Sequence, residues 1–323
     1  MWLVQTTEAR RTRIKHTLFV FFVSPWFVIA AMESQITNRK SEIRRVAVIG
    51  AGTMGHGIAQ VAAMAGYQTW LTDSNPETLT AAMRRIASNL EGAVKRGKIT
   101  QDDANAAAAR VQTAVDVAAA ARDADLVIEA VAEDLDIKEQ LFQQLDAVVG
   151  DDAVLASNTS SLSVTRIAHA TRRPERVVGM HFFNPVHIMK LVEVIAHPRS
   201  DPAVIAAARE AAGEMGKTTI LVRDTPGFAS SRLGVVLGLE AMRMVEQGVA
   251  SAADIDTAME LGYGHPMGPL RLTDLVGLDV RLNIAEYLHR ELRDPKFEPP
   301  QILRDKVHRR ELGKKTGRGF YEW

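Results

Sequence analysis

A strand, a glycine turn and a helix follow one another early in the chain, and this segment constrains the fold more than any other. The β-branched run Val46 to Ile49 leads into GAGTMG, residues 50–55, and then into an apolar stretch of helical period. A second predicted strand, Gln68 to Thr72, ends at Asp73. The order strand, glycine turn, helix, strand and acid is typical of the first unit of a doubly wound, mostly parallel sheet.

The glycine turn also indicates what the sheet binds. Gly50 permits a tight turn, Gly52 lets the backbone approach a pyrophosphate, and Gly55 lets the helix pack closely on the strand. Thr53 and Met54 lie in the same loop, next to the helix N-terminus where phosphates bind. A glycine pattern alone is a weak signal, but here the flanking strand and helix agree with it.

Asp73 indicates the kind of dinucleotide. It follows Gly52 by about 20 residues, the distance at which an acid accepts hydrogen bonds from the ribose hydroxyls of the adenosine. A carboxylate there repels a 2′-phosphate, and the next residues, Ser74 and Asn75, provide no arginine to hold one. The sequence therefore predicts NAD, rather than NADP, as the cofactor.

Composition and charge exclude several other classes of protein. The chain has 323 residues, 46% of them hydrophobic, which is enough for a large core. Its 39 basic residues balance its 39 acidic ones, so no overall field attracts nucleic acid or an anionic membrane. It contains no cysteine, which removes disulfides and zinc–thiolate sites and suits a reducing compartment. We predict a cytoplasmic protein with no metal site and no nucleic-acid partner.

Two further apolar strands and a later change of pattern define the expected architecture. Leu126 to Ala130 and Ala153 to Ser157 are nearly uniformly apolar, as in a parallel sheet covered on both faces. Alanine-rich patterns between Leu79 and Ala121 predict a helical insertion after the second strand. After DTPGF, apolar residues recur at helical spacing. We therefore predict a Rossmann-type α/β domain over residues 44–223 and an all-α C-terminal domain over residues 224–323.

The first 43 residues differ from the rest and are interpreted as an N-terminal extension. Basic residues precede an apolar stretch, TLFVFFVSPWFVIAAM, that is interrupted by Pro25 and is shorter than a membrane span. Three interpretations stay open. Met32 is the true start, or the residues form a weakly ordered extension, or they are a targeting or anchoring signal. Only the last would bring the chain to a membrane.

Polar residues follow three of the apolar strands, at the place where a ligand would bind. In a doubly wound sheet, ligands collect outside the carboxyl ends of the strands. Glu133, the serine-rich stretch 157–161 and His181 should therefore face the same crevice. Simpler explanations exist for some of them. Ser161 or Ser163 can cap the helix VTRIAHA, and Glu133 can be a solvated acid at a helix start.

A histidine and a glutamate stand on either side of an Asn-Pro turn. His181 ends the apolar run RVVGM, and Glu193 lies inside the apolar strand KLVEVI. Asn-Pro favours an abrupt turn, so the chain can double back there and bring KLVEVI near the first strand of the pair. Glu193 shares its strand face with Leu191 and Ile195, which predicts a buried carboxylate.

A buried carboxylate needs a cationic or proton-donating neighbour. An imidazole supplies both, and the carboxylate in turn fixes the tautomer of the imidazole and stabilises the imidazolium. Next to a nicotinamide, this pair predicts alcohol oxidation with His181 as the general base. The alternative is a structural ion pair between His181 and Glu193.

The C-terminal half contains two segments with local signals. SAADIDTAMELG begins with a serine cap and predicts a short helix that stops at glycine. GYGHPMGPLRLTDLVGLD combines prolines and glycines with apolar residues. It predicts either a shaped loop near the substrate or a packed turn between helices.

Seven motifs extend over nearly the whole chain beyond the extension, from about Arg45 to Trp323. They are VIGAGTMGHGIA, DLVIEAV.E, SNTSSL, HFFNPV..MKLVEVI, DTPGF, DIDTAM.LG...PMGP and LGKKTGRGFYEW. Together they make the chain resemble the (S)-3-hydroxyacyl-CoA dehydrogenase family, especially its bacterial 3-hydroxybutyryl-CoA dehydrogenase branch. The resemblance implies NAD-dependent interconversion of a short-chain (S)-3-hydroxyacyl-CoA and the 3-oxoacyl-CoA, as in β-oxidation. It also implies a homodimer formed through the C-terminal helical domain.

The resemblance further implies roles for individual residues. His181 resembles the catalytic base and Glu193 its partner, while Ser160 resembles the serine that bonds the substrate oxygen near the nicotinamide. Ser88 and Lys95 correspond to coenzyme A contacts on the helical insertion, although Lys95 by itself reads as a solvated helix charge. Four polar side chains correspond to cofactor contacts: Glu133, Lys138, Asn184 and Lys315.

One position departs from the family pattern. Many relatives have an active-site asparagine where GFASSRL has Ser231. Serine is shorter and lacks the two-sided bonding of an amide. This puts the positioning of the substrate at that point in question, but not the base or the hydride path.

Two other functions stay open. A related dehydrogenase acting on a hydroxy acid such as gulonate would keep the cofactor half and His181 but change the acyl-binding part. The intact PMGP and GKKTG argue against it. A non-catalytic NAD-binding protein would have no need to retain Ser160, His181 and Glu193 together.

Overall fold

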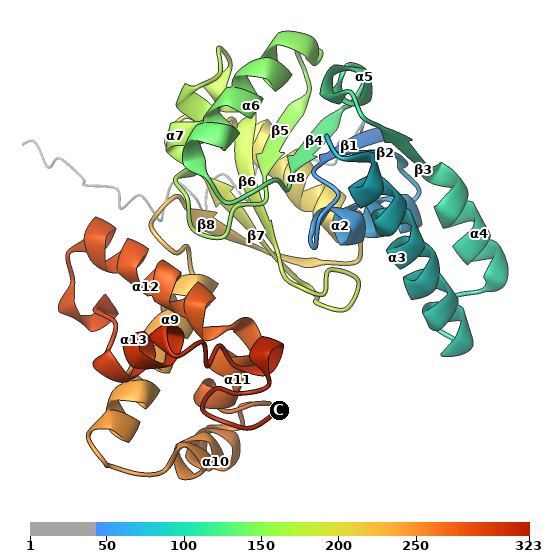
Figure 1. The fold of residues 1–323 in the computed structure, drawn as a ribbon. Helices are drawn as coiled ribbons and strands as arrows, with labels where there is room; N and C mark the ends of the chain where they lie inside the picture. Colours follow the sequence, from blue (N-terminus) through green and yellow to red (C-terminus); the bar gives the residue numbers. More distant parts are fainter. Residues whose placement is uncertain (1–42) are drawn as a thin grey trace, which may run out of the picture. The chain divides into compact units, whose positions relative to one another are not determined.

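The structure, a computed structural model, describes residues 43–323. In this range an eight-stranded sheet is followed by a run of helices, as Figure 1 shows. The three interpretations of the N-terminal extension concern residues that lie almost wholly outside the described range. Within residues 43–323, no helix has both the length and the apolarity that a membrane span requires.

The sheet has the strand order of a doubly wound fold. Its strands are β1 (Arg45–Ile49), β2 (Gln68–Thr72), β3 (Val111–Ala114), β4 (Leu126–Glu129), β5 (Val154–Ser157), β6 (Val177–Phe182), β7 (Leu191–Ala196) and β8 (Thr218–Arg223). They lie in the order β3-β2-β1-β4-β5-β6-β7-β8, and neighbouring strands are parallel except β6 and β7. The prediction of a Rossmann-type, mostly parallel sheet is confirmed.

Helices cover both faces of the sheet. They are α2 (Gly55–Met64), α3 (Pro76–Lys95), α4 (Gln101–Arg110), α5 (Val117–Ala121), α6 (Leu135–Val148), α7 (Val164–His169) and α8 (Pro202–Glu214), with a 3-10 turn at Pro174–Arg176. On β1, Val46 and Val48 belong to the core that contains residues of α2, α3 and α8. Ala47 and Ile49, which point the opposite way, belong to the core with α5, α6 and α7. Because both faces are buried, the central strands are continuous apolar runs.

The prediction of a helical insertion between Leu79 and Ala121 is only partly correct. α3 and α4 form it, and each begins at a capping side chain, Asn75 and Thr100. Val111–Ala114, however, forms the edge strand β3, which pairs with β2. Most of its side chains are not buried, so it has no apolar pattern of its own. Its strand conformation depends on pairing with β2, which a local pattern does not reveal.

From Ser230 on, the chain is helical, as predicted. It forms α9 (Ser230–Glu246), α10 (Ala252–Tyr263), α11 (Pro269–Val276), α12 (Leu278–Leu292) and α13 (Gln301–His308), with 3-10 turns at Pro295–Phe297 and Lys314–Thr316. A separate apolar core, which includes Leu239, Leu270 and Leu288, holds these helices together.

Two local predictions in this part were wrong. α10 does not stop at Gly262 but continues to Tyr263, and Gly264 caps it in the left-handed conformation, with φ 70°. The segment GYGHPMGPLRLTDLVGLD is not mainly a loop, because it contains α11 and the start of α12. Pro269 begins α11, where its missing N–H is not needed, and Gly277 separates α11 from α12.

Candidate active site

Two glycines of the turn between β1 and α2 lie so close to other backbone atoms that a side chain would not fit there. Gly50 has a φ of +99°, and a Cβ there would lie 2.6 Å from a carbonyl oxygen of the segment after β4. A Cβ on Gly55 would lie 1.7 Å from the carbonyl oxygen of Gly50. Gly52, in contrast, faces open space, with nothing within 4 Å of its Cβ position. Thr53 is exposed and Met54 half-buried beside it, so a ligand can approach the backbone here.

The groups around this turn fit a dinucleotide. α2 has no side-chain cap and no acidic residue in its first turn, which suits its N-terminal N–H groups to phosphate oxygens. Asp73 stands after β2, where its carboxylate accepts hydrogen bonds from Ala51 N at 2.9 Å and Asn75 N at 3.0 Å. A cavity of about 490 Å³ is lined by Gly50, Gly52 and Asp73 and by residues that follow β4. It lies at the point where the strand order reverses.

Lys138 is in the interior rather than on the surface of this cavity. It is 1% exposed, and its Nζ lies 2.6 Å from Oε1 of Glu129, which is fully buried at the end of β4. Glu129 also accepts hydrogen bonds from Ser157 Oγ and Val131 N. The strongest interaction of Lys138 is therefore with Glu129, and its contact with the cofactor stays a prediction. Our sequence reasoning missed Glu129, although a glutamate inside an apolar strand is the signal that drew attention to Glu193.

Glu133 holds the loop that follows β5. Its Oε1 accepts hydrogen bonds from Thr159 Oγ1 at 2.6 Å and from Ser160 N at 2.8 Å, and its Oε2 lies 3.4 Å from Lys138 Nζ. Ser160 is half-buried and is thus held through its backbone rather than its hydroxyl. Ser163 caps α7, as its simpler interpretation predicted.

His181 and Glu193 are direct neighbours across the only antiparallel pair of the described sheet. They occupy opposite positions on β6 and β7, and His181 Nδ1 lies 2.7 Å from Glu193 Oε2. His181 is 5% exposed and Glu193 is fully buried. The rings of Phe183 and Phe228 lie 4.5 Å and 6.0 Å from the imidazole, centroid to centroid. The imidazole is therefore held both by the carboxylate and by apolar neighbours.

The start of α9 supplies further hydrogen-bond donors to Glu193. Ser230 donates from its N–H to Oε1 at 2.9 Å and from its hydroxyl to Oε2 at 2.8 Å, and Ala229 N donates to Oε1 at 3.2 Å. Burial raises the pKa of Glu193, but the bonds from His181 and Ser230 outweigh it and hold this pKa below its ordinary value. Glu193 is therefore ionised at neutral pH. Two of these bonds come from Ser230, which the sequence reasoning missed. Ser231 follows it and is half-buried.

The remaining predicted contact residues are spread over other elements. Asn184 is exposed on the turn between β6 and β7. Ser88 and Lys95 are exposed on α3, and Lys95 Nζ pairs with Glu91 at 2.6 Å, as expected of a solvated helix charge. Lys315 Nζ lies 2.5 Å from Asp279 on α12. The roles proposed for these four side chains toward cofactor or coenzyme A stay predictions.

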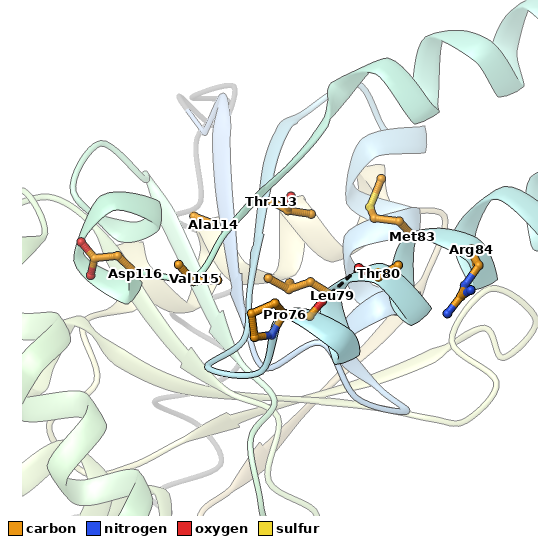
Figure 2. A pocket seen from close by; sticks show the side chains of 9 residues that line it. All are labelled: Pro76, Leu79, Thr80, Met83, Arg84, Thr113, Ala114, Val115 and Asp116. Carbon is orange, nitrogen blue, oxygen red and sulfur yellow. Dashed lines mark hydrogen bonds between the residues drawn. The ribbon is translucent and has the colours of Figure 1, made fainter.

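A second cavity, of about 810 Å³, lies beside α3 and β3. Figure 2 shows its apolar lining, which includes Leu79, Met83 and Val115, with Arg84 and Asp116 on opposite sides of the view. None of the predicted catalytic or cofactor-binding residues lines this cavity. It is therefore separate from the candidate active site.

A doubly wound sheet with a nucleotide turn at its switch point and a buried imidazole–carboxylate pair on two further strands of the same sheet is typical of NAD-dependent dehydrogenases. Family comparison is more specific. The model of the 3-hydroxyacyl-CoA dehydrogenase NAD binding domain matches residues 45–225, and that of the 3-hydroxyacyl-CoA dehydrogenase C-terminal domain matches residues 227–323. The chain belongs to the 3-hydroxyacyl-CoA dehydrogenase family. NAD as the cofactor and the oxidoreductase class, both predicted above, are confirmed.

Individual members of the family are similar in sequence to most of this chain. A probable 3-hydroxybutyryl-CoA dehydrogenase of Bacillus subtilis is 44% identical over 282 residues, which cover 87% of this chain and 98% of the relative. The mitochondrial hydroxyacyl-coenzyme A dehydrogenase of Rattus norvegicus is 42% identical, with coverage of 88% and 93%. The crystal structure of (S)-3-hydroxybutyryl-CoA dehydrogenase from Ralstonia eutropha is 39% identical, with a TM-score of 0.84 and coverage of 87% and 99%.

Proposed function

We propose that this 3-hydroxyacyl-CoA dehydrogenase interconverts (S)-3-hydroxybutyryl-CoA and acetoacetyl-CoA, with His181 as general base and Glu193 as its partner. The observation that carries the proposal is the 2.7 Å hydrogen bond between His181 Nδ1 and Glu193 Oε2. His181 is near the end of β6, which runs parallel to the central strands. It therefore lies at the carboxyl ends of these strands, on the same side of the sheet as the nucleotide turn. The relatives named as 3-hydroxybutyryl-CoA dehydrogenases support a short-chain substrate.

The hydrogen bond sets the state of the imidazole. An ionised carboxylate can only accept, so Nδ1 of His181 carries the hydrogen and Nε2 is left with a lone pair. Nε2 can then take the proton of the substrate hydroxyl, and Glu193 stabilises the imidazolium that results. Bound NAD⁺ supplies the hydride acceptor for the alcohol carbon. In the reverse direction, the imidazolium returns the proton to the forming alcohol.

Other residues of the site have supporting roles in this proposal. Ser160 bonds the substrate oxygen, and Glu133 holds the backbone of Ser160 for that purpose. Asp73 binds the adenosine ribose. Four more polar residues contact the cofactor: Glu133, Lys138, Asn184 and Lys315. Two contact coenzyme A: Ser88 and Lys95.

We further propose that residues 224–323 form the substrate and dimerisation domain of a homodimer. Large apolar side chains on α10 support this, because Leu261 is 83% exposed and Tyr263 is 79% exposed. The predicted cytoplasmic location stays a prediction.

A thioester comparison tests the proposed function. We expect the protein to oxidise NADH, followed by the loss of nicotinamide absorbance, with acetoacetyl-CoA but not with free acetoacetate. Turnover of the free acid at a similar rate would indicate a dehydrogenase for non-CoA hydroxy acids. Tight NADH binding without turnover of any 3-oxoacyl-CoA from C4 to C16 would indicate a non-catalytic protein and reject the proposal.

Ser231→Asn restores the asparagine found in many relatives, and we expect acetoacetyl-CoA reduction to change less than about tenfold, or about 1.4 kcal/mol. The reason is that the bonds to Glu193 come from Ser230, so the substitution leaves the imidazole and carboxylate as they are. The measurement is kcat/KM together with a circular dichroism spectrum. A folded variant whose kcat/KM falls by several orders of magnitude would contradict this prediction.

A further inference from the structure

Phe228, between β8 and α9, has a backbone conformation that a bulky side chain rarely adopts. Its φ is +49°, in the left-handed region that favours glycine. Within residues 43–323, Arg293 and Arg310 are the other non-glycine residues with a positive φ. Both are exposed and lie just after α12 and α13, where left-handed residues commonly end a helix. Phe228 is 3% exposed and lies before a helix, so its conformation needs another explanation.

The backbone on both sides of Phe228 is held in place. Phe228 N donates a hydrogen bond to Thr225 O at 2.9 Å, and Arg232 N donates to Gly227 O at 2.8 Å. Gly227 has a φ of +76°, and a Cβ there would lie 2.8 Å from the side chain of Leu288 on α12. Because these contacts fix its neighbours, Phe228 can keep a left-handed conformation that costs free energy. Such strain persists most often at functional sites.

The left-handed backbone brings the ring of Phe228 to the imidazole of His181. The ring centroids are 6.0 Å apart and the ring planes are tilted by 53°, within the range of an aromatic pair. The ring also belongs to the apolar core that contains Val164 and Ile195. It therefore cannot move away from the imidazole without leaving a cavity in a packed interior.

The hydrogen bond to Glu193 restrains only one end of the imidazole. It holds Nδ1 of His181 at 2.7 Å from Oε2, but by itself it lets the ring rock about that contact. Neighbouring rings limit this motion and keep Nε2 pointing in one direction. Phe183, the nearer ring, is half-buried, whereas Phe228 is buried and anchored in the core. Phe228 is therefore the firmer of the two restraints.

The same turn of the backbone also serves Glu193. Directly after Phe228, the N–H groups of Ala229 and Ser230 both donate to Oε1 of Glu193, at 3.2 Å and 2.9 Å. Successive N–H groups converge on one anion where a left-handed residue and a right-handed residue adjoin. Ala229 is right-handed, with φ −95° and ψ −54°. The conformation of Phe228 thus contributes to both members of the pair.

We propose that Phe228 is a positioning residue of this enzyme, whose left-handed backbone places its ring against His181 and so fixes the direction of Nε2. The inference rests on the proposed function, because it takes His181 as the general base. Phe228 has no group that can transfer a proton, so its effect is on geometry alone. A misplacement of about 1 Å can cost about 100-fold in rate.

Replacement by glycine and by alanine separates the ring from the backbone. Glycine adopts a positive φ without strain, whereas alanine keeps the strain, so Phe228→Gly should unfold at a higher urea concentration than Phe228→Ala. Both variants lack the ring, and we expect each to lower kcat for acetoacetyl-CoA by about 10- to 100-fold while KM for NADH is unchanged. The variant that fits the backbone better should thus still be slow.

Phe297→Ala is the matched control. Phe297 is a fully buried phenylalanine in the separate apolar core of the C-terminal helices. Its replacement should lower the urea concentration of unfolding, as any large-to-small change in a core does, but leave kcat unchanged. A structural role of Phe228 alone would give the same result as this control.

Proton NMR gives a second readout that needs no turnover. The Nδ1 proton of His181, bonded to a carboxylate, should give a far-downfield signal that is absent from His181→Ala. In Phe228→Gly this proton should exchange faster with water, because the imidazole is less covered. If neither the glycine nor the alanine variant folds, Phe228→Leu takes their place and should lower kcat by at least about threefold and speed the same exchange.

Three results would overturn the inference. They are a wild-type kcat in the folded glycine variant, or in Phe228→Leu if only that variant folds, an unchanged exchange rate of the Nδ1 proton, and an alanine variant more stable than the glycine variant. If the wild-type protein does not reduce acetoacetyl-CoA, the proposed function fails, and the exchange measurement still decides whether Phe228 holds the imidazole. If it does reduce acetoacetyl-CoA, any of the three results removes this inference alone.

Discussion

Replacing His181 with alanine should lower kcat for acetoacetyl-CoA by about 10²- to 10⁴-fold, the usual contribution of a positioned general acid–base group. The affinity for NADH should change little, because the nucleotide turn and Asp73 contribute nothing to the imidazole–carboxylate pair. Steady-state rates give kcat, and a fluorescence titration with NADH gives the affinity. A fall in both quantities to the same extent would indicate a damaged fold rather than a lost base.

Two companion variants make this result specific. Glu193→Gln keeps the shape but cannot stabilise an imidazolium, so we expect kcat to fall substantially while NADH affinity is kept. His197→Gln is the matched control, because His197 is another histidine that is 5% exposed, and it bonds the Pro174 carbonyl away from the site. Normal turnover by Glu193→Gln would reject the paired role of these residues and leave only a structural ion pair.

Replacing Lys138 with methionine should lower the free energy of unfolding by about 3–5 kcal/mol, the range for removing one partner of a buried ion pair. The lysine is 1% exposed, and the substitution leaves the fully buried Glu129 with only the donors from Ser157 and Val131. Urea unfolding of the protein, followed by circular dichroism, measures the change. A loss below about 1 kcal/mol would mean that Glu129 is neutral or reaches water.

The double variant Glu129→Gln with Lys138→Met is the control for this effect. It removes both charges, so we expect it to be more stable than Lys138→Met alone by at least half of the loss. Lys95→Met is the matched exposed lysine, since its pair with Glu91 is 73% and 65% exposed and such pairs contribute little. If the double variant is less stable than either single one, the two side chains do not act as a buried charge pair.

Features that depend on neighbouring residues were predictable from the sequence. The turn at Gly50 and Gly55 follows from backbone angles and close contacts within one strand–helix unit. The meeting of His181 and Glu193 was also accessible, because an Asn-Pro turn joins two adjacent strands and strand alternation fixes which side chains face each other. The long helices and apolar strands followed from their periodicity for the same reason.

Features that depend on distant segments could not be predicted from the sequence. β3 is a strand only because β2 lies beside it. The carboxylate of Glu193 accepts hydrogen bonds from Ser230, which begins a helix 37 residues later in the chain. Lys138 was expected only as a cofactor contact, and its buried ion pair with Glu129 arises where α6 packs on the sheet.

The sequence by itself therefore determined the NAD-binding class and the sheet, and it predicted that His181 and Glu193 would meet. Only the tertiary structure decided which buried charges of residues 43–323 pair with one another, as Lys138 does with Glu129. The physical reason is that turns, caps and periodic faces are set by residues a few positions apart, whereas desolvation and ion pairing depend on every segment that packs around a group.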